Sequence, residues 1–173
     1  MIELISSTLP PAVLIGDLCL VVLFLALIFR KSWGGDIVFF VGKNALVLGL
    51  LVALTAVLGS LFYSNIVGFV PCNLCWWGRI LIFPQLLLFL TALKFKDYGV
   101  FKYSWRLAVL GVLLSIYNIY IQMGGNPLVP CPIASTCTKI YVDAYGFITI
   151  PSMALAVSLG FILVAWAYNK HNE

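Results

Sequence analysis

The sequence predicts an all-α integral membrane protein, with a core bundle of four transmembrane helices and one additional N-terminal transmembrane helix, making five spans. Of its 173 residues, 63% are hydrophobic and 9% are charged, whereas soluble domains are about 45–50% apolar and about 25% charged. Five apolar runs are long enough, or nearly so, to cross a hydrocarbon core about 30 Å thick. These continuous runs lack the alternation of barrel strands, and lipid admits only helices or closed barrels.

We expect the spans near residues 12–29, 44–63, 76–93, 105–123 and 147–168. The first run is interpreted as a retained helix and not as a signal peptide. Only Glu3 precedes it as a charged residue, and the sequence FRKSWGG that follows is a poor cleavage site. Residues 1–43 therefore form an extra N-terminal transmembrane helix with a cytoplasmic loop in this prediction, and residues 44–173 form the four-helix domain.

The basic residues predict the orientation in the cell membrane. If the five runs alternate in direction, every Lys and Arg except Arg79 and Lys139 falls on the same side. By the positive-inside rule this side is cytoplasmic, so we expect the N-terminus outside and the C-terminus inside. The net charge of +4 is therefore a topology signal. It does not indicate nucleic acid binding, because the basic residues are spread through short loops.

The same alternation places two close cysteine pairs on the outer, oxidising side, Cys72 with Cys75 and Cys131 with Cys137. Outer cysteines usually form structural disulfides. Here, however, each bond would close a short loop and would restrain little of the unfolded chain. Short-loop pairs at helix starts are more typical of redox-active cysteines. Cys19 lies alone within the first predicted span.

The stretch FVPCNLCWWGRIL, residues 69–81, carries the first pair. Pro71 precedes Cys72 and an apolar helix continues from Trp76, so the thiols are expected at a helix N-terminus, where amide N–H groups and the helix dipole favour a thiolate. Cys75 and Arg79 are four residues apart and share a helical face. Arg79 could stabilise the Cys75 thiolate, hold the polar oxygen of a small molecule, or only extend to the outer interface.

Two other site chemistries fit the cysteines less well. A c-type haem needs a histidine directly after the second cysteine, and Trp76 occupies that position. A four-thiolate zinc site has enough ligands, but the spacing from Cys131 to Cys137 is long for a zinc knuckle and the compartment is oxidising. The sole histidine, His171, lies in the predicted cytoplasmic tail.

The motif PCNLCWWGR, followed by a second cysteine pair in the next outer loop, resembles the DsbB family of disulfide bond formation proteins. The stretch DAYGFITIPSMALA, residues 143–156, after CPIASTC is similar to the shorter BdbC-like branch of that family. The resemblance covers about residues 44–168. It implies a membrane oxidoreductase that uses a quinone, either ubiquinone or menaquinone, to support disulfide bond formation.

The resemblance also implies roles for individual residues. Cys72 and Cys75 would be oxidised by the membrane quinone, with Cys75 and Arg79 beside it. Cys131 would form a mixed disulfide with a DsbA-like thioredoxin-fold partner on the outer face, and Cys137 would resolve it toward the first pair. Trp76 is a further candidate quinone contact by its proximity, as are Trp77 and Gln85.

Some features depart from the family. The first span is additional to a four-helix core, and its Asp17 and Cys19 have no family role. A histidine near the quinone, present in some members, is absent from the outer side here. Two other functions therefore remain open: a metal-handling membrane protein that uses the four outer thiols, and a structural assembly factor with static disulfides.

Overall fold

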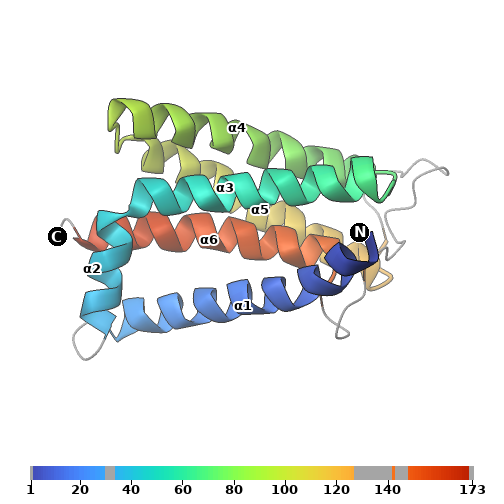
Figure 1. Ribbon diagram of the computed structural model, residues 1–173, viewed down its shortest axis with the longest axis horizontal. Helices are drawn as coiled ribbons and strands as arrows, with labels where there is room; N and C mark the ends of the chain where they lie inside the picture. The colour runs from blue at the N-terminus through green and yellow to red at the C-terminus, as the bar shows by residue number, and fades with distance from the viewer. Residues whose placement is uncertain (1, 30–33, 127–141, 143–147, 172–173) are drawn as a thin grey trace.

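The computed structural model describes residues 2–29, 34–126, 142 and 148–171, and helices make up nearly all of them (Figure 1). Each long apolar run of the sequence has become a helix, because only intrahelical hydrogen bonds satisfy the backbone in lipid. In chain order the elements are α1 (Ile2–Ile28), α2 (Gly35–Lys43), α3 (Ala45–Leu61), the π-helical turn η2 (Phe62–Ile66), α4 (Asn73–Phe95), α5 (Val100–Gln122) and α6 (Ile150–His171).

Among the described residues, four helical segments are long and apolar enough to cross a membrane: Ala45–Ile66, Asn73–Phe95, Val100–Gln122 and Ile150–His171. A fifth, shorter apolar segment, Val13–Ile28, forms most of α1. At about 1.5 Å per residue it spans about 24 Å, slightly less than a typical hydrocarbon core. The predicted all-α membrane fold, with four core helices and one additional N-terminal helix, is confirmed.

The boundaries differ from the prediction most at three places, and the first is α1, which begins at Ile2 and not near residue 12. Residues 30–43 were expected to be a loop, but Gly35–Lys43 forms the helix α2. This segment is too short to span lipid and is amphipathic, with Val38 and Gly42 buried and Asp36 and Lys43 placed at the ends that the helix dipole favours. In addition, α5 begins at Val100 and not at 105, since the helix extends past its most apolar part.

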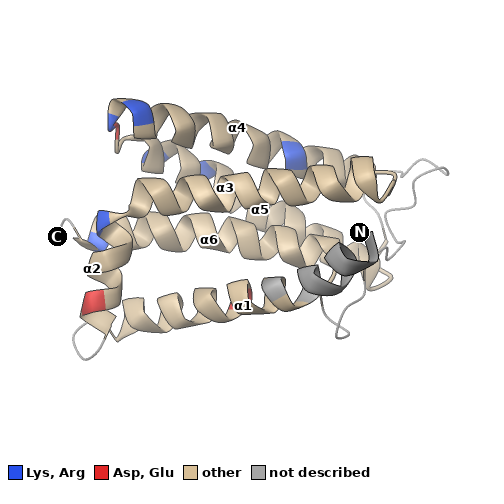
Figure 2. Cartoon of the chain, in the orientation of Figure 1, with Lys and Arg blue, Asp and Glu red and all other residues tan. Residues whose placement is uncertain are grey.

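Helices α3, α4, α5 and α6 lie side by side, and α1 runs along α6 at the edge of the bundle (Figure 1). Helix α2 crosses the end of the bundle and packs on α6. The two chain ends lie at opposite ends of the bundle, as an odd number of crossings requires. Most of the described Lys and Arg residues gather at the end where α4 and α6 end (Figure 2); that this end faces the cytoplasm stays a prediction.

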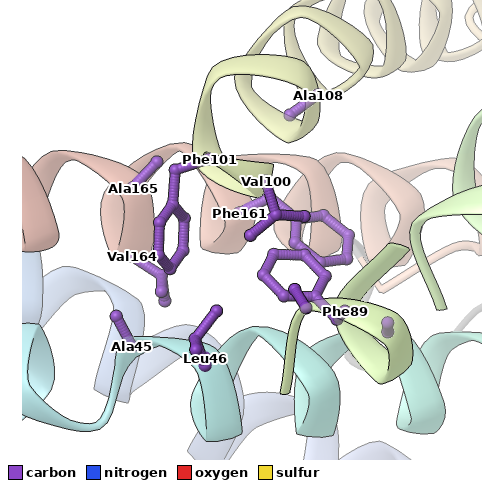
Figure 3. Close-up of a cluster of buried hydrophobic side chains, with 11 residues drawn as sticks. Ala45, Leu46, Phe89, Val100, Phe101, Ala108, Phe161, Val164 and Ala165 are labelled. Carbon is purple, nitrogen blue, oxygen red and sulfur yellow. The ribbon is translucent and has the colours of Figure 1, made fainter. Parts of the chain in front are cut away.

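Aromatic rings fill the centre of the bundle (Figure 3). Phe89 of α4 stacks on Phe161 of α6 with ring centroids 5.7 Å apart and meets Phe101 of α5 edge-on at 5.8 Å. Gly49 of α3 allows this close approach, because a Cβ atom at that position would overlap the Phe89 ring. Small residues at helix contacts are the usual means of close packing between membrane helices.

A polar bridge also joins α4 to α5 inside the bundle. The Ser104 hydroxyl donates to Oε1 of Gln85 at 2.6 Å, and both side chains are buried. Nε2 of Gln85 donates to the Leu81 carbonyl at 3.4 Å. Gln85, a candidate quinone contact in the sequence analysis, is therefore engaged in an interhelical hydrogen bond. Helix α4 continues without a break through Pro84.

Candidate active site

The segment between α3 and α4 places the first cysteine pair at the start of α4. After the π-helical turn η2 the chain reverses at Gly68, which has a φ of 81° that glycine adopts without steric cost. The Phe69 N–H donates to the Tyr63 carbonyl at 3.0 Å, and their rings stack with centroids 5.9 Å apart. This compact turn brings Cys72 to the N-terminus of α4.

Cys72 is the N-cap residue of α4, with φ of −75° and ψ of 169°, and its Sγ atom accepts from the Cys75 N–H at 3.4 Å. Sulfur thus occupies the capping position that serine or aspartate oxygen usually takes. The Sγ atoms of Cys72 and Cys75 are 2.9 Å apart. A disulfide bond is about 2.05 Å long, so a small movement would join the two sulfur atoms.

The two thiols differ in their access to the surroundings. Cys72 is buried in a small apolar cluster with Leu74 and with Ile121 from the last turn of α5. Cys75 is only partly buried, against the same cluster. Cys72 is therefore the less solvent-accessible of the two thiols.

The helix start also changes the acidity of Cys72. Its pKa is lowered to about 6, first because the Cys75 thiol can donate a hydrogen bond to a Cys72 thiolate, and then because backbone N–H groups of the first turn do the same. These hydrogen bonds outweigh burial, which acts in the opposite direction. The predicted stabilisation of a thiolate at this helix N-terminus therefore applies to Cys72.

In the reduced protein we expect the Cys72 thiol to deprotonate with a midpoint near pH 6. Hydrogen bonds to the charged form lower a pKa, so Cys75→Ala, which removes the principal donor, should raise the midpoint toward the ordinary value of about 8.5. Cys75→Ser keeps a donor and should give a smaller rise. Thiolate ultraviolet absorbance, taken as the difference from Cys72→Ser, measures this. An unchanged midpoint in Cys75→Ala would contradict the assignment of the donor.

Arg79 lies one turn further along α4 than Cys75, and its guanidinium reaches across to α3. Nε donates to the Ser60 hydroxyl at 3.0 Å, and Nη2 donates to the Ser60 carbonyl at 3.3 Å. The Arg79 Cζ atom also lies 5.2 Å from the Trp76 ring centroid. A cation at the C-terminal end of α3 is favoured by the helix dipole. The side chain is thus fixed between two helices beside the dithiol.

Sequence reasoning missed Ser60. It lies 19 residues before Arg79, and a serine in the last turn of an apolar run carries no signal of its partner. Trp76 and Trp77 are both exposed on α4, on a surface suited to lipid or to an apolar ligand. Cys131 and Cys137, the predicted second pair, lie outside the described residues.

No group of three or more His, Cys, Asp or Glu side chains able to hold a metal ion occurs within the described part of the chain. Cys19, the other cysteine described there, is exposed on α1. The structure thus brings Cys72, Cys75, Trp76 and Arg79 together at one end of α4 and leaves Cys19 apart from them.

The fold and this site define an all-α membrane protein with a dithiol capping a transmembrane helix. The family described as disulfide bond formation protein DsbB matches residues 42–168, and the chain belongs to this family. Over 116 residues it is 40% identical to disulfide bond formation protein C of Bacillus subtilis (strain 168), covering 66% of this chain and 82% of the relative.

Two other relatives are each named probable disulfide formation protein. The one from Oceanobacillus iheyensis is 36% identical over 129 residues, covering 70% of this chain and 86% of that protein. The one from Coxiella burnetii (strain CbuK_Q154) is 39% identical over 124 residues, covering 69% of this chain and 84% of that protein. These relatives confirm the predicted resemblance to the BdbC-like branch. No solved structure matches the chain with comparable significance.

Proposed function

We propose that this membrane oxidoreductase of disulfide bond formation is a thiol:quinone oxidoreductase. It reoxidises a DsbA-like thioredoxin-fold dithiol oxidase outside the cytoplasm and passes the electrons to a membrane quinone. The observation that carries the proposal is the capping dithiol, in which Cys72 and Cys75 lie 2.9 Å apart with the pKa of Cys72 lowered to about 6. Such a pair can cycle between dithiol and disulfide with little movement of the helix.

The electron balance follows from two disulfide exchanges. The partner loses two electrons as its two thiols become a disulfide, and the Cys131–Cys137 disulfide is reduced to two thiols. Those thiols then reduce the Cys72–Cys75 disulfide and reform their own. When the disulfide is attacked at Cys75, the backbone N–H groups at the start of α4 still stabilise Cys72 as the leaving thiolate. The chemistry that a bound quinone would supply is acceptance of two electrons and two protons per disulfide.

The residues present fit a quinone. A quinone is an apolar ring with carbonyl acceptors, and Arg79 has five N–H donors, of which Ser60 occupies two. Partly buried Cys75 and the exposed Trp76 ring lie on the same turn of α4. We therefore assign Arg79 and Trp76 to holding the quinone beside Cys75. Arg79 would orient a carbonyl oxygen, and Trp76 would cover the ring.

The proposed coupling also has a thermodynamic reason. A DsbA-like oxidase has a reduction potential of about −120 mV, so few protein dithiols can reoxidise it downhill. A quinone pool supplies the missing driving force. The orientation proposed for this chemistry places the N-terminus outside, the C-terminus in the cytoplasm and the capping dithiol at the outer face.

We assign the oxidase chemistry to residues 44–173 and regard residues 1–43 as an addition to that domain. Helices α1 and α2 pack mainly on α6, and their buried contacts come from residues such as Leu23, Ala26 and Val38. The dithiol cluster instead draws on α4 and α5. A truncated chain without α1 and α2 would thus lose the covering of α6 and keep the contacts of the dithiol with Leu74 and Ile121.

The test uses purified full-length protein, a reduced thioredoxin-fold partner and a soluble quinone analogue. We expect quinone reduction that depends on the partner and is abolished by Cys131→Ala, because the partner then has no disulfide to attack. Stoichiometric zinc that protects all four thiols from alkylation would instead support the metal-handling alternative. A Cys131→Ala variant that loses only stability, with no quinone reduction by the wild type, would support the structural alternative.

A further inference from the structure

A groove lies at the opposite end of the bundle from the dithiol, between the start of α5 and the last turns of α6. Its volume is about 930 Å³. Ile121 in the last turn of α5 packs on Cys72, and α5 begins at Val100, so its first turn lies about 30 Å away along the helix. The groove is therefore distinct from the redox site and takes no part in the function proposed above.

Two cations line this groove, Lys102 and Arg106 of α5. They are four residues apart and share a helical face, where like charges repel. Both side chains are exposed, and the described residues provide neither with a carboxylate partner. The nearby Asp97 carboxylate accepts from the Gly99 N–H at 2.8 Å. The pair thus presents an unneutralised positive charge at the mouth of the groove.

Apart from Asn169, the other side chains that line the groove are aromatic or apolar. Trp105 of α5 and Trp166 of α6 line it and are exposed, and Tyr98 stacks on Tyr168 with ring centroids 5.2 Å apart. Trp and Tyr favour the level of lipid headgroups. Ile162 continues the groove along α6 toward the bundle centre. A ligand here would meet cations at one end and apolar surface at the other.

We propose that this groove binds an anionic phospholipid, with the phosphate held by Lys102 and Arg106 and an acyl chain along Trp166 and Ile162. The charge complementarity selects an anionic headgroup over a zwitterionic one. Basic pockets between transmembrane helices are known to take such headgroups. Arg106 lies about 6 Å deeper than Lys102 along α5, so the two cations can contact a phosphate from two depths. The positive end of the α5 dipole adds to the attraction.

The test is native mass spectrometry of the full chain released from mixed bilayers of phosphatidylglycerol and phosphatidylcholine. We expect phosphatidylglycerol adducts to exceed phosphatidylcholine adducts. The double variant Lys102→Gln, Arg106→Gln should reduce this preference by about tenfold or more, since each cation near the surface contributes. The matched control is Lys94→Gln, Lys96→Gln, which removes two exposed cations at the same end of the bundle but outside the groove. The control should keep the preference.

Two results would overturn the proposal. One is an equal loss of preference in both double variants, which would mean that total charge and not the groove attracts the lipid. The other is displacement of phosphatidylglycerol by inorganic phosphate, which would mean that the cations bind a free anion and the apolar part contributes nothing. A folding defect is separated from both by the melting temperature, which should match between the two double variants in phosphatidylcholine alone.

Discussion

Cys75→Ser is expected to stop steady-state quinone reduction, with a loss of at least about 1,000-fold, as for removal of a reacting group. In our proposal Cys72 cannot form its disulfide without Cys75, so the route to quinone is interrupted. The Cys131–Cys137 disulfide can be formed beforehand in the purified variant with a small-molecule disulfide, which is then removed. The variant should therefore oxidise about one equivalent of reduced partner in a burst and then stop. Rapid-quench measurement of partner thiols alongside quinone absorbance distinguishes the burst from turnover.

The matched control for this experiment is Cys19→Ser. Cys19 is exposed on α1 and contributes to none of the contacts at the start of α4, so its replacement should leave both the burst and the turnover unchanged. Sustained quinone reduction by Cys75→Ser would remove Cys75 from the electron path. A missing burst, with the fold intact, would instead remove the second cysteine pair from it.

The sequence was sufficient to predict the membrane fold, because hydropathy alone determines which segments can satisfy their backbone in lipid. The prediction from the sequence was wrong for a segment whose composition does not favour one secondary structure. Residues 35–43 combine apolar and charged side chains, and their helical state depends on Val38 and Gly42 finding a surface on α6. The contacts that stabilise so short an amphipathic helix come from α6 and cannot be identified from the segment itself, so it was assigned to a loop.

For the candidate site, the local arrangement along α4 was predictable from the sequence, but the contacts with other helices were not. The sequence predicted the dithiol at a helix start and Cys75 and Arg79 on one helical face, and in the structure Cys72 is the N-cap of α4, which contains Cys75 and Arg79. The partners of the polar side chains were not predictable, because they come from other helices. Arg79 is hydrogen-bonded to Ser60, and Gln85 is hydrogen-bonded to Ser104. Both contacts join residues 19 apart in the sequence, which helical periodicity does not relate.

The second large effect is expected for Arg79→Met, which keeps the length of the side chain and removes its charge and donors. We expect kcat/KM for a soluble quinone to fall about 100-fold, the usual cost of losing a donor aimed at developing charge. The pre-steady-state oxidation of the partner should be unchanged, because that step precedes quinone reduction in our proposal. Stopped-flow measurement of both steps on the same sample tests this separation.

Arg79→Lys and Ser60→Ala separate the charge of Arg79 from its placement. Lys keeps the charge but lacks the Nε donor and the planar fork of arginine, and Ser60→Ala removes only the hydroxyl that accepts from Nε. If Ser60 positions the guanidinium, Ser60→Ala should raise KM for quinone several-fold in the wild-type background and have no effect in Arg79→Met. Such non-additivity is the signature of two residues that act through one interaction. Additive effects would show that the Ser60 hydroxyl stabilises the bundle independently, and the positioning of Arg79 would then come from the Ser60 carbonyl and from Trp76.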